Sequence, residues 1–277
     1  MIKKYIINEY LLAWYLLFND SPTEDLCHLK RKLWINYKKQ YNGLFYDREK
    51  IINDYKNFIP DNDTIYNIIM DSKDFKSLKK ELEKQRINLI KTWDKNKKLI
   101  NRVQKSIIRK DYEDFDCLLI NECFSIHETF KNNNLIILGK KYDSENQTII
   151  NLIFEIVKSK VNINIKDNKE IKDAIIEMAI LNEFASFLNE VSCYKEGTKN
   201  LYNLKKQIYP YWLMYLGIKR EDMVEYMMRD KIAFESNNYA YEKELINMNL
   251  EEFIEFIIRN KRYIIKEEKK TYIDEII

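Results

Sequence analysis

The stretch that decides the fold of this chain is residues 134–158, which reads NLIIL at 134–138 and SENQTIINLIFEIVK at 144–158. The first segment is a short apolar run, typical of a buried strand that ends at Gly139. The second opens on Ser144 with a glutamine three residues later, which is the pattern of a helix capping box. Its apolar residues then recur at helical spacing through Val157. The sequence therefore predicts a strand followed by an amphipathic helix.

A second helix is predicted further along the chain, at residues 169–190, and it contains N-E-F-A-S at 182–186. Apolar residues, among them Ile176, Ile180 and Phe187, fall on the face of Glu183, so its carboxylate is expected to project from an apolar stripe. Burial of a carboxylate is costly unless the group is paired or binds a metal. Glu183 is therefore a candidate functional residue, and the alternative is an ordinary helical glutamate.

Composition favours a mostly helical fold. Four glycines and three prolines in 277 residues leave little material for tight turns or Gly-rich phosphate-binding loops. The strand signals are DCLLINECF at 116–124 and NLIIL at 134–138, which predict a small sheet. The predicted class is mostly α, of the α+β type, with a helical N-terminal region at residues 1–75 and a second domain at 76–277 that ends in helices.

Apolar spacing and capping residues predict the remaining helices. They are expected at 5–18, 26–37, 48–58, 64–70, 74–108 with a break near 94–96 left open, 223–234, 239–248 and 249–262.

The chain is expected to be cytoplasmic and to have no membrane partner. Its most apolar N-terminal stretch, Tyr10 to Phe18, is about half the length that a bilayer-spanning helix needs. No small-residue cleavage site follows it, so we interpret it as a buried helix and not as a signal peptide. The four cysteines are scattered and include no C-x-x-C pair, which agrees with a reducing compartment.

Positive charge is concentrated in one segment. The net charge of +3 is too small to indicate nucleic-acid binding by itself. Residues 76–110, however, contain thirteen Lys or Arg and three acidic residues, 13 − 3 = +10, which leaves 3 − 10 = −7 for the rest of the chain. This basic helix could follow a phosphate backbone, with Trp93 stacked on a base, so nucleic-acid binding is retained as an alternative function. The simpler interpretation is a solvated helix face.

The segments F-E-I-V-K at 154–158 and N-E-F-A-S at 182–186 together resemble the active site of the gluzincin metallopeptidases. In that family H-E-x-x-H on one helix supplies two zinc ligands and a general base, and a glutamate on a later helix supplies the third ligand. The resemblance covers roughly residues 80–215. It implies a zincin-like domain in which Glu155 matches the general base and Glu183 the third ligand.

The two histidine positions of that motif are occupied by Phe154 and Lys158. Phe154 has no donor atom, and Lys158 would have to lose its proton to bind zinc. We therefore expect no zinc and no peptidase activity, and we expect Lys158 to form an ion pair with Glu183 or Glu155 in place of the lost metal. The resemblance then implies a catalytically inactive peptidase-like protein.

Such a protein is expected to bind a peptide or a protein partner, because the former cleft could still accept an extended chain along its edge strand. Candidate cleft residues are His127, Tyr209, Tyr211 and Trp212, and for the three aromatic residues the alternative is ordinary core packing. A further alternative is an active metallohydrolase with a rearranged site, in which Glu155, Glu183 and His127 hold the metal.

Overall fold

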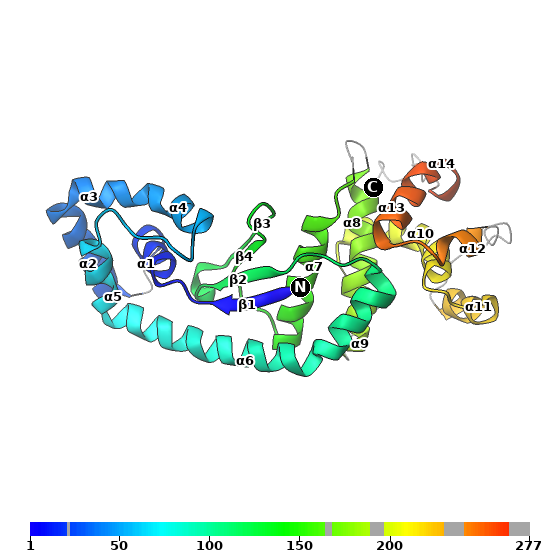
Figure 1. The fold of residues 1–277 in the computed structure, drawn as a ribbon, viewed down its shortest axis with the longest axis horizontal. Helices are drawn as coiled ribbons and strands as arrows, with labels where there is room; N and C mark the ends of the chain where they lie inside the picture. The colour runs from blue at the N-terminus through cyan, green and yellow to red at the C-terminus, as the bar shows by residue number, and fades with distance from the viewer. Residues whose placement is uncertain (21–22, 164–167, 189–196, 230–240, 266–277) are drawn as a thin grey trace, which may run out of the picture. The chain divides into compact units, whose positions relative to one another are not determined.

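The computed structural model describes residues 1–20, 23–163, 168–188, 197–229 and 241–265 (Figure 1). The predicted class is confirmed, because the structure is 69% helical and has one small, mixed sheet of four strands. The chain forms two compact units, one of residues 1–96 and 113–152 and the other of residues 97–112 and 153–277. The sequence predicted a boundary between two domains at residue 75. The two compact units do not test whether such domains fold independently, so this boundary stays a prediction.

The first unit contains the sheet and the N-terminal helices. Its elements are β1 (Ile2–Ile6), α1 (Glu9–Phe18), α2 (Glu24–Asn36), α3 (Lys38–Gly43), the 3₁₀ helix η1 (Leu44–Tyr46), α4 (Asp47–Asn53), α5 (Thr64–Asp71), most of α6 (Lys73–Val103), β2 (Phe115–Leu119), the 3₁₀ helix η3 (Glu122–Phe124), β3 (Ile126–Phe130), β4 (Leu135–Gly139) and the first half of α7 (Glu145–Lys160).

The sheet has the strand order β1-β2-β4-β3. β1, β2 and β4 are parallel, and β3 runs antiparallel to β4 at the edge, with Ile126 opposite Gly139 and Phe130 opposite Leu135. All five residues of β2 and of β4 are buried, which explains why these two strands could be predicted from their apolar runs.

The sequence prediction missed two strands and placed part of one in a helix. The helix predicted from residue 5 begins only at Glu9, and the chain before it forms β1. The burial pattern of β1 does not alternate, because its pairing with β2 shifts between Ile2 and Lys4. The second missed strand, β3, consists of five half-buried residues with the mixed sequence IHETF, and so has no apolar run.

The long basic helix is continuous through residues 94–96, so α6 has no break there. It ends in a π-helical turn, η2 (Gln104–Ile108). Trp93 is 9% exposed and packs edge-on against Tyr5, with ring centroids 6.4 Å apart. Figure 1 shows α6 running beside the sheet of the first unit. This burial removes Trp93 from the surface where a base could stack.

The second unit is helical in its described residues. Its elements are the end of α6, η2, the second half of α7, α8 (Lys169–Glu177), the π-helix η4 (Met178–Phe184), α9 (Ala185–Phe187), the 3₁₀ helix η5 (Lys199–Leu201), α10 (Tyr202–Tyr215), α11 (Arg220–Arg229), α12 (Glu242–Leu245), α13 (Leu250–Arg259) and α14 (Lys261–Ile264). The predicted helix ends at 190 and 234 and the predicted start at 239 lie outside the described residues.

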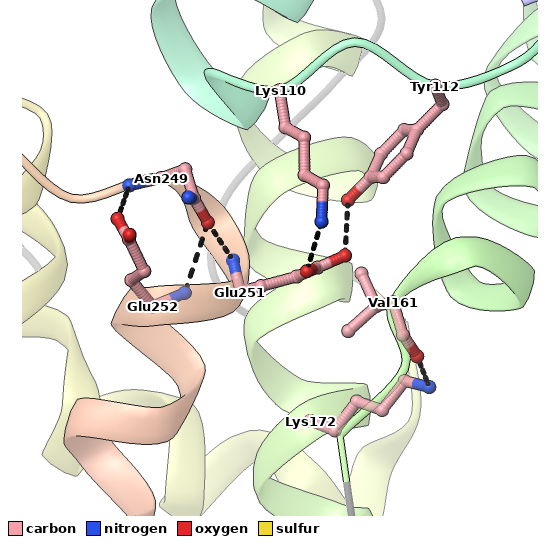
Figure 2. Close-up of polar contacts among 7 residues, drawn as sticks. All are labelled: Lys110, Tyr112, Val161, Lys172, Asn249, Glu251 and Glu252. Atoms are coloured by element: carbon pink, nitrogen blue, oxygen red, sulfur yellow. Dashed lines mark hydrogen bonds and ion pairs between the residues drawn. The ribbon is translucent and has the colours of Figure 1, made fainter.

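Two of the predicted helix starts are confirmed by their capping contacts. Ser144 Oγ accepts a hydrogen bond from the Gln147 backbone N–H (3.0 Å) at the start of α7. Asn249 and Glu252 form a capping box at the start of α13 (Figure 2). In the same first turn, the Glu251 carboxylate accepts hydrogen bonds from Lys110 (2.5 Å) and Tyr112 (3.4 Å), which attaches α13 to the segment after η2.

No helix in the described part of the chain is long and apolar enough to cross a membrane.

Candidate functional site

The segment F-E-I-V-K lies in the second half of α7, as predicted. Val157 and Ile156 are fully buried, whereas Phe154, Glu155 and Lys158 are half-buried. Lys158 Nζ lies 5.3 Å from the centre of the ring of Phe154, which precedes Lys158 by one helical turn. The two residues that match the histidine positions of the motif therefore contact each other. The predicted ion pair of Lys158 with Glu155 or Glu183 is not found among the described residues.

Glu183 lies in the π-helix η4 and not in a regular α-helix. Its Oε1 accepts a hydrogen bond from the Trp212 indole N–H (3.3 Å). Ile176 and Ile180 are buried as expected, but Phe187, expected on the same stripe, is 40% exposed. A π-helical turn adds a residue per turn and rotates the positions after it, so the 3.6-residue spacing used in the prediction does not hold there.

Glu183, Tyr209 and Trp212 line one cavity of the second unit, with a volume of about 540 Å³. This volume is within the range of sites for small ligands or single side chains. The remaining wall residues come from the end of α6, η2, η4, α9, the segment after α10, and α11. They are Arg102, Ser106, Ile107, Met178, Asn182, Ser186, Phe187, Leu216, Ile218 and Tyr226.

The cavity combines an aromatic wall with one charge of each sign. Trp212 is fully buried and stacks on Tyr215 with ring centroids 5.0 Å apart, so its position is fixed by the core behind it. The Arg102 guanidinium lies 5.7 Å from the Phe187 ring, and Arg102 forms no ion pair with any residue that the structure describes. Peptide side chains and backbone could be bound by such a mixed surface.

The other two candidate cleft residues lie elsewhere. Tyr211 is 5% exposed and packs against Tyr241 and Phe256 with ring centroids 6.4 and 6.5 Å apart, as a core residue does. His127 belongs to β3 in the first unit, where its Nδ1 is 2.8 Å from the Tyr142 hydroxyl. The cleft expected from four residues thus reduces to a cavity that contains two of them.

A metal site is not apparent among the described side chains, where no three His, Cys, Asp or Glu residues gather closely enough to hold an ion. The rearranged set Glu155, Glu183 and His127 is not among such groups either. The absence of zinc from the protein itself stays a prediction.

The same unit contains a buried ion pair that was not predicted from the sequence. Lys205 Nζ lies 2.5 Å from Glu177 Oε2, and the two side chains are 1% and 6% exposed. Thr198 donates to Glu177 from its backbone N–H (3.1 Å) and from its hydroxyl (2.6 Å). Gly197, at φ +101°, allows this close approach, because a Cβ at this position would clash with the Glu177 carboxylate. The sequence pattern that could have predicted this pair is the spacing of Lys205, which lies four residues from the apolar Leu201 and Tyr209 and so falls on their helix face.

No family model, no curated protein and no solved structure matches this chain in comparisons with known proteins.

Proposed function

We propose that this chain is a catalytically inactive, metallopeptidase-like protein that binds a peptide segment of a protein partner. The observation that supports this most is the cavity of the second unit, where Glu183, Tyr209 and Trp212, chosen from sequence, line one surface. The order of elements also agrees with the resemblance, because β4 leads into the helix with F-E-I-V-K and a later helix contains Glu183.

The cavity has the properties expected of a site for peptide side chains. Trp212 and Tyr209 are 0% and 6% exposed, so they form a rigid floor fixed by the core, and the aromatic surface that a ligand can reach is Phe187, which is 40% exposed. Arg102 and Glu183 provide one cationic and one anionic group at the wall, which would select among peptide side chains by charge. Neither of the two former histidine positions has a zinc ligand, so a binding function is favoured over hydrolysis.

Selection from a displayed library of random peptides, followed by titration of the selected peptides, tests the proposal. Phe187→Ser and Arg102→Gln alter exposed wall residues, so both variants should fold. We expect Phe187→Ser to weaken binding about tenfold or more, as expected for an aromatic anchor at an interface. Val224→Ser and Arg262→Gln are matched controls, because both residues are exposed and lie outside the cavity wall. Equal affinities for wall and control variants would refute the site.

A further inference from the structure

The first unit has an exposed segment of unusual charge, residues 26–46, which we call the basic segment. It contains five Lys or Arg and no acidic residue, although the whole chain has 44 acidic residues in 277. It comprises most of α2, then α3 and η1, and Figure 1 shows α2 and α3 at the end of this unit away from the sheet. Its positive charge is therefore not balanced within the segment, although Glu24, Asp25 and Asp47 flank it.

Four of the five cations are available to an external partner. Lys30 donates a hydrogen bond to the Asn19 carbonyl and is half-buried. The other four are exposed and form no ion pair with the residues that the structure describes; they are Arg31, Lys32, Lys38 and Lys39. Lys38 lies over the Trp34 ring, 5.1 Å from its centre, so its charge is next to an exposed aromatic surface.

Large apolar side chains are exposed in the same segment. Trp34 is 45% exposed, Ile35 61%, Phe45 58% and Tyr46 70%. Phe45 packs on Phe18 with ring centroids 5.7 Å apart, so it is anchored from behind while more than half of it faces solvent. Single exposed apolar residues are common, but four within thirteen residues of an acid-free segment indicate an interaction surface.

The position of Ile35 distinguishes between classes of anionic partner. Arg31 and Lys32 precede it by four and three residues, so all three lie on the outer face of α2, opposite the buried Leu26 and Leu33. An aliphatic side chain neither stacks on a base nor accepts a hydrogen bond. It does gain free energy when it enters the boundary between lipid head groups and acyl chains, while the adjacent cations contact the head groups.

We propose that the basic segment binds the surface of an anionic lipid bilayer. Arg31, Lys32, Lys38 and Lys39 would lie at the phosphate and carboxylate groups, and Trp34, Ile35, Phe45 and Tyr46 provide the apolar side chains for the interface, where Trp and Tyr are favoured. This contact is peripheral and differs from a membrane span. It differs from the expectation from sequence that the chain has no membrane partner, which stays a prediction that the experiment below tests, and it is independent of the peptide cavity.

Sedimentation of the full chain with vesicles tests the proposal. The wild type should sediment with vesicles of phosphatidylcholine containing about one third phosphatidylserine, and not with phosphatidylcholine alone, because each basic residue near an anionic surface contributes about fivefold in binding. The quadruple exchange of Arg31, Lys32, Lys38 and Lys39 to Gln should reduce binding at least tenfold. Ile35→Ser should also reduce it severalfold at unchanged charge.

Matched controls separate this surface from general stickiness. Exchange of four exposed lysines of α6, Lys84, Lys91, Lys95 and Lys97, to Gln removes equal charge elsewhere, and Ile59→Ser removes an 83% exposed isoleucine. Both controls should bind vesicles as the wild type does. The proposal is overturned if the wild type does not prefer anionic vesicles, or if the α6 variant loses as much binding as the basic-segment variant. It is also overturned if Ile35→Ser binds unchanged while a single-stranded oligonucleotide competes for the segment.

Discussion

The buried Glu177–Lys205 pair gives the sharpest test of the energetics of the second unit. Lys205→Met keeps most of the side-chain volume but removes the charge. It leaves the Glu177 carboxylate buried, with hydrogen bonds from the backbone N–H and the hydroxyl of Thr198. Removal of one partner of a buried pair typically costs about 3–5 kcal/mol, since the remaining charge is uncompensated. Because Thr198 still donates to Glu177, we expect the lower end, about 3 kcal/mol.

The double variant distinguishes a stranded charge from lost packing. Lys205→Met combined with Glu177→Gln leaves no buried charge, so its unfolding free energy should lie within about 1 kcal/mol of the parent value. The assay is urea denaturation followed by circular dichroism, with the slopes compared to check that one transition is observed. A control is Lys76→Met, which breaks an exposed pair with Asp71 and should cost less than about 1 kcal/mol.

A buried, charge-dependent contribution of Lys205 is refuted if Lys205→Met costs as little unfolding free energy as Lys76→Met. It is equally refuted if the double variant loses as much unfolding free energy as Lys205→Met and Glu177→Gln lose in sum, because the loss would then come from packing and not from charge.

Three further predictions concern Asp116, the pair Phe154 and Lys158, and Cys117. Burial raises the pKa of the Asp116 carboxyl, but hydrogen bonds from the Tyr55 and Lys56 side chains outweigh burial and hold this pKa below its ordinary value of 3.8. The stability that these hydrogen bonds contribute is present above about pH 4 and is lost as the pH falls through the lowered pKa. Asp116→Asn should therefore make the unfolding free energy fall less steeply at acid pH, and an unchanged pH dependence would contradict this. Phe154→His together with Lys158→His should create zinc affinity measurable by elemental analysis, and the parent should contain no stoichiometric zinc. A folded double variant that binds zinc no better than the parent would exclude gluzincin geometry. Burial raises the pKa of the Cys117 thiol, so a thiol reagent should label exposed Cys27 in the native chain and Cys117 only after unfolding. Rapid labelling of Cys117 in the native chain would show that β2 is not buried.

Features of the fold that depend on local chemistry could be predicted from sequence. β4 and the start of α7 were predictable because Leu135 to Leu138 form one buried apolar run and Ser144 caps the helix after it. β1 and β3 were not, because a strand at the edge of a sheet needs no apolar run. The partner of β1 is also far away in sequence, whereas β3 pairs with the next strand, β4. Met1 and Phe115, for example, meet only in the folded chain.

The candidate site was predictable only in part, for a related reason. Glu183 and Trp212 were chosen as separate residues, and the hydrogen bond between them depends on the π-helical turn of η4, which apolar spacing does not reveal. The ion-pair partner of a buried lysine is likewise set by tertiary packing. The prediction therefore assigned a partner to Lys158, which instead contacts Phe154, and missed Lys205, which is the buried one.

The most direct test of the central claim, that the cavity of the second unit binds peptides, is photocrosslinking from its wall. A photoreactive benzoylphenylalanine in place of Phe187 should crosslink to a peptide selected on the wild-type chain, because this side chain is 40% exposed and lines the cavity. The same group in place of Val224, which is 45% exposed and outside the wall, should not. Saturable crosslinking from position 187 alone is the result we predict, and equal crosslinking from both positions, or crosslinking from position 224 only, would contradict the account.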